Sequence, residues 1–398
     1  MEELTSTQEV KPPSTKKGPV KWVKDNLFST WYNTILTCLG FVVLFFAAKS
    51  FFTWAFTQAQ WAVIPANLQI LSMGAYPLEQ AWKIAVVIYG LAVLLGLSAG
   101  IWNGLIRQIT VAIGCLGAII VILPFYVSIR EHALIATVIL AVCFAIGRNR
   151  DHWKRWVIIG WVLSFPLTMI TLHGFGANTV TTTHWGGLLL TLILAAIGIV
   201  ACFPLGVLLA LGRRSQLPAV RWVSTVYIET IRGVPLITLL FMGSILLPIF
   251  MPGDFQLDKV IRAMVVLTLF SASYMAENVR GGLQAIPQGQ VEAAQAVGLT
   301  YPKTMLFIVL PQALRAVIPA IVGQSIALFK DTTLVSIVGL LDLLGIARSI
   351  LGNPNWQGLQ PEVYLFIAII YFVFCYAMSF GSQRVESELS FGHGNVGI

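Results

Sequence analysis

Charged residues within long apolar stretches are the first positions at which this sequence could perform chemistry. Lys330 and Asp331 are adjacent, follow an apolar run and precede Thr332. An ammonium beside a carboxylate could bind a small molecule that carries both charges, or the two could form an ion pair at a helix end. Asp342 is a further candidate of this kind, because a charged group near the centre of a bilayer costs about 2.5–3.5 kcal/mol. These four residues are our candidates for a substrate pathway.

A second pair of charges has the spacing of neighbours on a helix. Glu229 and Arg232 are three residues apart, so their side chains can meet on one helix face. We predict that they form a structural ion pair at the cytoplasmic edge of a membrane-spanning helix.

The longest polar segment between two apolar runs extends from Ala276 to Lys303. Loops of this length without a role are uncommon. Residues 290–297 are rich in helix formers and stop before Gly298, a residue type favoured just past a helix end. Thr300, followed by a proline, predicts the start of a second short helix. The segment has two interpretations. It is either a pair of helices joined by a tight bend or a solvated connector.

Metal, redox and nucleotide chemistry have no visible site in this sequence. The five cysteines lie far apart inside apolar runs, and no pair has metal-binding or redox spacing. None of the five histidines forms a metalloprotease motif, and no phosphate-binding glycine motif is present. We therefore predict no metal and no cofactor bound by this chain. If the protein uses a nucleotide, another chain must bind it.

The composition is that of a membrane protein. Apolar residues make up 57% of the chain and charged residues only 11%, against about 45–50% and about 25% in soluble domains. This excludes an ordinary cytosolic enzyme. The net charge of +8 would suggest a nucleic-acid partner in a soluble protein, but in an apolar chain it indicates lysines and arginines facing cytoplasmic lipid. With a mean hydropathy of +0.82, the sequence predicts an all-α polytopic membrane protein.

Ten apolar stretches are the predicted membrane-spanning helices, because a span needs about 20 apolar residues. Residues 334–350 are also apolar, but Asp342 and three glycines interrupt or end that run. We therefore predict a re-entrant or interfacial helix there. The predicted spans are residues 34–56, 83–102, 108–128, 132–147, 155–172, 187–211, 222–250, 260–277, 306–329 and 362–381.

The distribution of basic residues predicts the orientation, since short loops rich in lysine and arginine stay in the cytoplasm. The stretches that would lie outside hold few basic residues, and two of them, residues 57–82 and 173–186, contain no lysine or arginine. Ten spans with both termini in the cytoplasm fit this pattern. Residues 1–33 are polar and lysine-rich, which predicts a disordered basic cytoplasmic leader, and residues 386–398 are expected to form a cytoplasmic tail.

Three ordered blocks resemble permease subunits of ABC importers. The first is YIETIRGVPLITLLF, the second ENVRGGLQAIPQGQVEAAQAVGLT and the third LPQALRAVIPAIVGQSIALFKDTTLVSIVGL. They are similar to the polar amino-acid uptake (HisM-type) subfamily, and the similarity covers about residues 187–381, half of the chain. The residues that match the EAA signature of this family are Glu292, Ala293, Ala294, Gly298, Ile308, Leu310 and Pro311.

This resemblance implies a domain organisation. Residues 181–385 would form a MetI-like permease core of five spans, in which the EAA loop, residues 277–305, couples the permease to a cytoplasmic ATPase. Residues 34–180 would form an N-terminal extension of about five helices. Short five-span members lack such an extension, whereas long permease subunits of general L-amino acid importers carry one, and this chain resembles them. It departs from the family at Gly323, where asparagine is frequent.

The resemblance also implies a function and partners. The chain would be the transmembrane permease subunit of an ATP-driven, binding-protein-dependent importer of L-amino acids in a bacterial inner membrane, and not an enzyme. Its expected partners are a cytoplasmic ATPase dimer that binds ATP and Mg²⁺, a second homologous permease in a heterodimer, a periplasmic amino-acid-binding protein and membrane lipid, with no nucleic acid. The alternatives are an ion-coupled secondary transporter, which should show repeated halves that this sequence lacks, and a membrane scaffold.

Overall fold

The computed structural model describes residues 18–122, 127–176, 179–250 and 257–390. Within these ranges the chain is built of helices and turns, and no β-strand occurs. The chain divides into two units, residues 1–61 and residues 62–398, which are treated separately below. The all-α prediction is therefore confirmed.

The first unit contains α1 (Pro19–Leu27) and α2 (Trp31–Thr53). A proline in the first turn of α1 is compatible with a helix start, because the missing N–H has no partner there. Part of the predicted disordered leader is thus helical, and the remainder, residues 1–17, lies outside the described residues. Thr30 caps α2 by accepting a hydrogen bond from the Asn33 N–H. No residue of α2 is buried, as befits a helix whose side chains face lipid.

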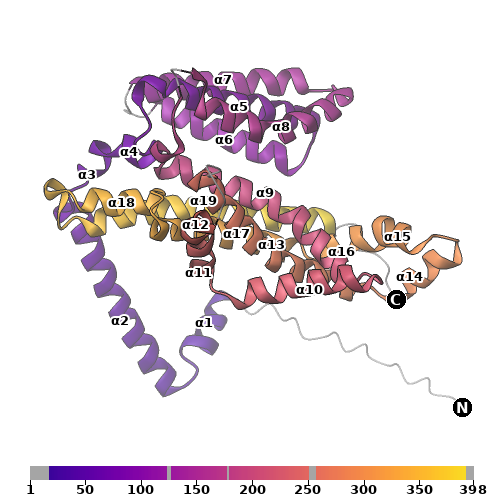
Figure 1. Cartoon of the computed structure of the whole chain (residues 1–398). Helices are drawn as coiled ribbons and strands as arrows, with labels where there is room; N and C mark the ends of the chain where they lie inside the picture. Colours follow the sequence, from indigo (N-terminus) through magenta and orange to yellow (C-terminus); the bar gives the residue numbers. More distant parts are fainter. Residues whose placement is uncertain (1–17, 123–126, 177–178, 251–256, 391–398) are drawn as a thin grey trace, which may run out of the picture. The chain divides into compact units, whose positions relative to one another are not determined.

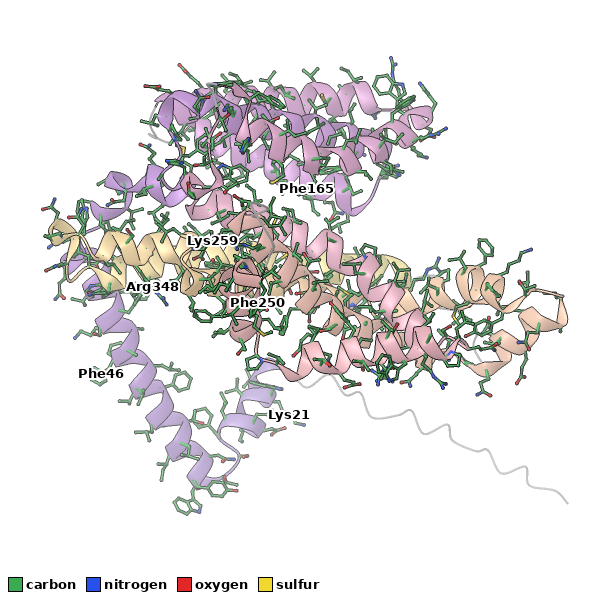
Figure 2. The ribbon with its side chains drawn as sticks, viewed as in Figure 1. Lys21, Phe46, Phe165, Phe250, Lys259 and Arg348 are labelled. Atoms are coloured by element: carbon green, nitrogen blue, oxygen red, sulfur yellow. The ribbon has the colours of Figure 1, made fainter. Side chains whose placement is uncertain are left out.

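In the described part of the chain, nine helices are long and apolar enough to cross a membrane, and a bent helix pair makes ten if it counts as one span. Large apolar side chains such as Phe46, Phe165 and Phe250 are exposed on the outside of their helices (Figure 2). The straight candidate spans are Trp31–Gln58, Leu78–Ile101, Leu105–Ile122, Ile129–Gly147, Asp151–His173, Gly187–Arg213, Lys259–Ala285, Ile318–Val338 and Gln360–Ser387.

The N-terminal part of the second unit is a bundle of four helices, which lie side by side in Figure 1. Helix α5 packs closely against α7 and also contacts α6 and α8. The close approach depends on glycine, because a Cβ atom on Gly100 would lie 2.6 Å from the carbonyl oxygen of Phe144. The four helices are α5 (Trp82–Ile101), α6 (Leu105–Ile122), α7 (Val127–Gly147) and α8 (Lys154–His173).

The C-terminal part is organised around α9 (Gly187–Arg213) and α13 (Lys259–Ala285), which pack against each other along their length. Gly206 of α9 lies directly on Met275 of α13, with 2.6 Å between the position of a Cβ atom and the methionine side chain. Around this pair lie α10 (Pro218–Gly233), α17 (Ile318–Asp331), α18 (Leu343–Leu351) and α19 (Gln360–Ser390). Shorter helices are α3 (Val63–Ala66), α4 (Leu68–Met73), α11 (Leu236–Phe241), α12 (Leu247–Phe250), α14 (Gln288–Ala296), α15 (Tyr301–Thr304) and α16 (Leu310–Ala316).

Proline breaks two of the predicted spans. The stretch 222–250 is not one straight helix, because α10 ends at Gly233 and the chain turns by 105° before continuing from Leu236 to Phe250. Pro235 lacks an N–H, and it forces Val234 into an extended conformation. The stretch 306–329 is likewise interrupted at Val317, and the candidate span there is Ile318–Val338.

The predicted re-entrant or interfacial helix at residues 334–350 is two short helices. A 3₁₀ helix, Thr332–Val338, continues directly from α17, and α18 begins at Leu343. Gly339 separates them with a φ of +77°, a left-handed conformation that residues with a side chain adopt only with strain. Neither piece is long enough to cross a membrane.

Candidate functional site

The predicted coupling loop begins later than its sequence suggests. Residues 277–285 are the last turns of α13, where Val279 and Leu283 are buried. Their apolar face packs against Ala210, Val309 and other residues of a cluster shared with α9 and α16, which favours continuing the helix. The connecting segment therefore runs from Ile286 to Thr304 and contains the hairpin of α14 and α15, which projects at one end of the second unit (Figure 1).

Gly298 ends α14 in a Schellman motif. The Leu299 N–H donates to the Ala294 carbonyl at 3.1 Å, and the Gly298 N–H donates to the Gln295 carbonyl at 2.9 Å. Gly298 has a φ of +83°, and no atom lies within 4 Å of the position of a Cβ atom. The bend therefore requires glycine for its backbone conformation and not for space.

The second half of the hairpin starts after Thr300, as predicted, but the Thr300 side chain makes no capping hydrogen bond. Residues 305–309 form a π-helical turn before α16. Pro311 has no N–H to donate, so the regular hydrogen-bond ladder is broken there. The Gln312 side chain donates instead to the Ile308 carbonyl at 2.8 Å. Leu310 is buried in the cluster that contains Ala276 and Leu283, which fixes the hairpin to α13.

The outer face of α14 carries small side chains and one carboxylate. Ala294 is buried against the rest of the hairpin, whereas Glu292 and Ala293 are exposed. Val297 is 77% exposed, an unusual position for a branched apolar residue outside the membrane-spanning region. Gly289 and Ala293, one turn apart on α14, form an exposed strip of small residues that another protein can approach closely, with exposed glutamines on either side of the strip.

An ionic network lies at the base of the hairpin, and the sequence-based prediction missed most of it. Arg213 of α9 contacts Glu277 at 2.7 Å and Glu229 at 2.8 Å. Arg280 contacts Glu277 at 2.8 Å, and Arg232 lies 3.8 Å from Glu277. Three helices, α9, α10 and α13, are therefore joined by five charged side chains.

The predicted direct pair between Glu229 and Arg232 is corrected by this geometry. Both residues belong to the network, but each has its ion-pair partner on a neighbouring helix. Glu277 is the shared acceptor, and its side chain is only 17% exposed. The spacing of Glu277 and Arg280, three residues apart, was the available signal, but the arrival of Arg213 from α9 depends on tertiary packing.

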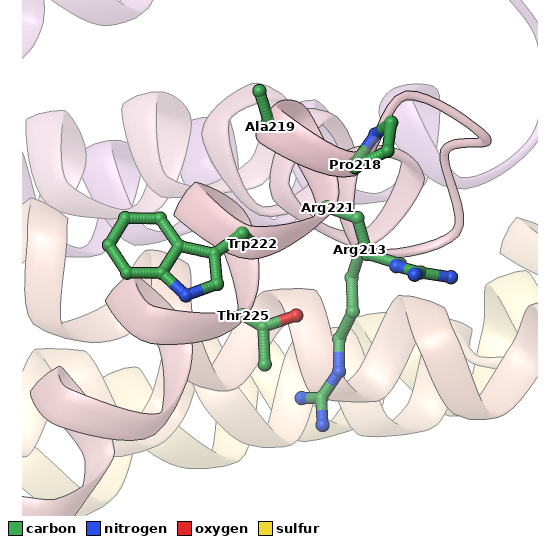
Figure 3. A pocket seen from close by; sticks show the side chains of 6 residues that line it. All are labelled: Arg213, Pro218, Ala219, Arg221, Trp222 and Thr225. Atoms are coloured by element: carbon green, nitrogen blue, oxygen red, sulfur yellow. The ribbon is translucent and has the colours of Figure 1, made fainter.

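A surface pocket adjoins this network where α9 meets α10. It has a volume of about 780 Å³ and is lined by side chains of both helices (Figure 3). Gly212 permits the junction, because a Cβ atom there would clash with the Ser224 hydroxyl. The lining residues are Arg213, Pro218, Ala219, Arg221, Trp222 and Thr225.

The structure brings two of the four predicted pathway residues, Thr332 and Asp342, to the side chain of Tyr371. Lys330 and Asp331 end α17, with Lys330 exposed and Asp331 half-buried. Neither forms an ion pair with another described residue. Thr332 is fully buried, and its hydroxyl donates to the Phe329 carbonyl at 2.7 Å. The threonine therefore stabilises the turn into the 3₁₀ helix.

Asp342 has a structural environment. It is fully buried and caps α18, with its carboxylate accepting from the Gly345 N–H at 3.0 Å and the Leu344 N–H at 3.2 Å. Burial raises the pKa of Asp342 to about 6, and the two backbone N–H groups oppose that rise. Next to it, the Thr191 hydroxyl accepts from the Leu343 N–H at 3.0 Å. These contacts join the start of α18 to the start of α9.

In the described residues, no group of histidine, cysteine, aspartate and glutamate side chains is arranged to hold a metal ion. The five cysteines are free thiols in positions that range from exposed to buried.

Comparison with known proteins assigns the family. Residues 202–390 match the family described as "Binding-protein-dependent transport system inner membrane component". The inner membrane amino-acid ABC transporter permease protein YhdY of Escherichia coli (strain K12) is 39% identical over 93% of both chains. The glutamate/glutamine/aspartate/asparagine transport system permease protein BztC of Rhodobacter capsulatus is 34% identical over 96% of both chains.

Shorter relatives match half of the chain. The probable glutamine ABC transporter permease protein GlnP of Bacillus subtilis (strain 168) is 36% identical over 51% of this chain and 91% of its own. The N-terminal extension is thus shared with YhdY and BztC, whose similarity extends over nearly their whole length. The chain belongs to the family of inner-membrane permease proteins of amino-acid ABC transporters.

Proposed function

We propose that the exposed face of α14 docks on a separate cytoplasmic ATPase and passes the force of ATP hydrolysis into the membrane helices. The chain is the permease subunit of a binding-protein-dependent amino-acid importer, a transport subunit and not an enzyme. The observation that supports the proposal is the hairpin with small exposed residues on α14, whose Val291 packs against the cluster that contains Leu283 and Leu310. ATP and Mg²⁺ would bind to an ATPase dimer, and this chain would bind no cofactor.

The ionic network would transmit the movement from the hairpin to the membrane helices. Glu277 and Arg280 lie on α13 just before the hairpin, and Arg213 connects them to α9. A shift of α14 would therefore act on α13 directly and on α9 and α10 through charge-assisted contacts. Such contacts can exchange partners without leaving a charge buried alone, because all three arginines and one glutamate of the network are more than a quarter exposed.

We infer that the hairpin and both chain termini are on the cytoplasmic side. The hairpin lies at the end of the second unit where α9, α13 and α19 finish and where basic residues are concentrated. The Arg384 side chain near the end of α19 donates to the Gln108 side chain near the start of α6, at 3.1 Å, so the same end includes the extension.

A second, homologous permease is the expected partner within the membrane. Two different permease proteins of Bacillus subtilis, GlnP and GlnM, both carry names for glutamine ABC transport and are 36% and 33% identical to this chain. Paired names of this kind support a heterodimer here. A periplasmic amino-acid-binding protein would deliver the substrate.

For the substrate we propose an L-amino acid met by Lys330 and Asp331. The lysine ammonium suits the substrate carboxylate, and the aspartate suits the substrate ammonium. Thr332 would hold the turn that carries them, and Asp342 would fix α18 rather than contact substrate. BztC is named for glutamate, glutamine, aspartate and asparagine, which makes acidic amino acids and their amides the first substrates to test. The ion-coupled alternative is not favoured.

The test is copurification of an ATPase with the tagged chain from detergent-solubilised membranes. Replacement of Ala293 by arginine should abolish copurifying ATPase activity, because a long charged side chain would separate the docking surfaces. The control is Ala219→Arg, at an exposed alanine of the same membrane end outside the hairpin. Equal ATPase recovery with all three proteins would contradict the docking proposal.

A further inference from the structure

A second pocket lies in the N-terminal extension, at the membrane end that carries the hairpin of α14 and α15. It has a volume of about 330 Å³ and opens between the end of α5, the start of α6 and the end of α7. Its lining is mostly polar or glycine. The lining residues are Ala99, Gly100, Ile101, Asn103, Arg107, Phe144, Arg148, Asn149 and Asp151.

Tight helix packing creates the pocket. A Cβ atom on Gly147 would lie 2.8 Å from the Leu97 carbonyl oxygen, so the end of α7 rests directly on α5. Asn149 then turns the chain with a φ of +64°, a conformation that asparagine tolerates better than most residues. As a result, the side chains that follow the two helix ends line one cavity.

The pocket is positively charged and lacks a matching anion. Arg107 stacks over the Phe144 ring with its guanidinium carbon 5.4 Å from the ring centroid. Neither Arg107 nor Arg148 forms an ion pair with another described residue. The one carboxylate of the lining, Asp151, is 3.0 Å from the Lys154 ammonium. Two arginines that line one cavity repel each other unless an anion lies between them.

Tryptophans mark the depth of the pocket in the membrane. Trp102 directly follows α5, Trp153 precedes α8, and Trp156 in the first turn of α8 is 70% exposed. Tryptophan is enriched at the level of the lipid headgroups. Below the pocket, Ile109 and Ile113 form part of an exposed apolar face on α6 that acyl chains can cover. A bound anion would therefore lie at headgroup depth with apolar surface beneath it.

We propose that this pocket is a binding site for the phosphate group of an anionic membrane lipid. Arginine pairs recognise phosphate oxygens by two parallel N–H contacts, and the amides of Asn103 and Asn149 supply further donors. Basic pockets between helix ends are a known form of lipid-headgroup recognition. Free phosphate shares the oxygen chemistry, but it would gain nothing from the apolar face of α6.

The site would also bear on how the extension is joined to the permease core. Arg107 is next to Gln108, which accepts the hydrogen bond from Arg384 of α19. Three further basic residues, Arg150, Lys154 and Arg155, come shortly after Arg148 in the sequence. A phosphate held by Arg107 would reduce the electrostatic repulsion among the basic residues at this end of the bundle. The lipid would thereby stabilise the contact between α6 and α19.

The experiment is native mass spectrometry of the full-length protein in detergent, titrated with phosphatidylglycerol, phosphatidylcholine or inorganic phosphate. We expect retained phosphatidylglycerol at concentrations where phosphatidylcholine and inorganic phosphate are not retained. The double variant Arg107→Ala/Arg148→Ala should bind phosphatidylglycerol at least about tenfold more weakly, since the loss of even one charge-assisted contact costs about that factor. Both arginines are exposed, and circular dichroism verifies that the helices remain.

The matched control is Arg155→Ala/Arg221→Ala, which removes the same charge at the same membrane end without touching the pocket. This control should bind phosphatidylglycerol like the unaltered protein. An equal loss in both double variants would overturn the proposal in favour of unspecific charge attraction. Retention of inorganic phosphate as strong as that of phosphatidylglycerol would overturn the lipid as the occupant, and equal binding of the two lipids would overturn recognition of the anionic headgroup.

Discussion

The two ends of α9 differ in how they hold charge. At its start, the carboxylate of Asp342 is fully buried and is satisfied by two backbone N–H groups of α18. At its end, about 40 Å away by helix rise, Arg213 pairs with Glu229 and shares Glu277 with two other arginines, in a network that is partly open to solvent. One end is held by a fixed cap, and the other by side chains that can exchange partners.

This difference suits the proposed coupling, in which an ATPase would act at the hairpin end of the permease. A backbone cap fixes one geometry, because its donors belong to the first turn of a helix. Side-chain ion pairs with several alternatives tolerate a relative shift of the helices. We therefore expect movement to be concentrated at the hairpin end, while the junction of α9 and α18 stays fixed.

The largest expected effect comes from removing the shared carboxylate. In Glu277→Gln, three arginines lose their common partner, and the glutamate side chain is only 17% exposed. The free energy of unfolding should therefore fall by about 2–3 kcal/mol, which is less than the loss measured for fully buried ion pairs. Thermal unfolding in detergent measures the loss, and transport should fall with it. The control Glu229→Gln, 55% exposed, should cost about 0–1 kcal/mol. Equal effects of the two variants would contradict the central position of Glu277.

The next largest loss of stability is expected at Asp342, where two variants separate the role of the side chain as a helix cap from the role of its charge. Asp342→Ala should destabilise the protein by about 1–2 kcal/mol, because two N–H groups of α18 lose their acceptor. Asp342→Asn keeps an acceptor and should retain most of the stability. Thermal unfolding of the two variants at neutral pH checks this, and equal destabilisation by alanine and asparagine would refute the capping role.

The same residue predicts a pH dependence. Its pKa is raised from 3.8 to about 6 in the folded protein, so the fold favours the protonated carboxyl group. As pH rises from about 4 to about 6, the unfolded chain loses this proton first, and the contribution of Asp342 to stability declines over that window. In Asp342→Asn this decline should be absent. Unfolding temperatures of both proteins between pH 4 and pH 7 provide the test.

At Gly298 we expect a change in stability of similar size, together with a loss of coupling. Gly298→Ala places a side chain at a φ of +83°, which costs about 1–2 kcal/mol locally and should misalign α14. ATPase activity coupled to substrate should drop while the permease remains folded. Gly281→Ala is the matched control, because Gly281 lies on α13 outside the proposed docking face, with open space around it and without a positive φ. Normal coupling in Gly298→Ala would refute the requirement for the bend.

The smallest effect is expected at Thr300. Its side chain makes no capping hydrogen bond, so Thr300→Ala should change the free energy of unfolding by less than about 0.5 kcal/mol, below the usual loss for a cap. Thr30→Ala, which removes the contact to the Asn33 N–H, is the comparison that should show the larger change. Denaturation followed by circular dichroism gives both values.

The sequence predicted the features that depend on local composition. Membrane helices follow from apolar runs, and the turn at Gly298 follows from a glycine after a helical stretch, which the structure confirms. Helix ends near proline were predicted less well. Pro235 and the break at Val317 change the course of two spans, because a proline inside an apolar run is compatible with either a kink or a break.

Contacts between segments that are distant in the sequence could not be predicted from it. Glu229 and Arg232 had the spacing of a pair, yet Arg213 and Glu277 compete for them across helices. Asp342 is a charged residue in an apolar segment, which suggested a place in the substrate pathway. In the structure its buried carboxylate caps the first turn of α18. In both cases the deciding partner comes from another part of the chain, and its position is set by packing of α9 against α13 and α18.

The π-helical turn at residues 305–309 has a consequence for the register of the coupling hairpin. A π turn holds one residue more than an α turn, so a single deletion between Met305 and Val309 could be absorbed by a return to α geometry. Elsewhere in a helix, removing one residue rotates everything beyond it by about 100°. The chain can therefore lose one residue at this turn without a change in the packing of α16. The direction of α14 relative to α16 would then be set by whether the turn is π-helical or α-helical.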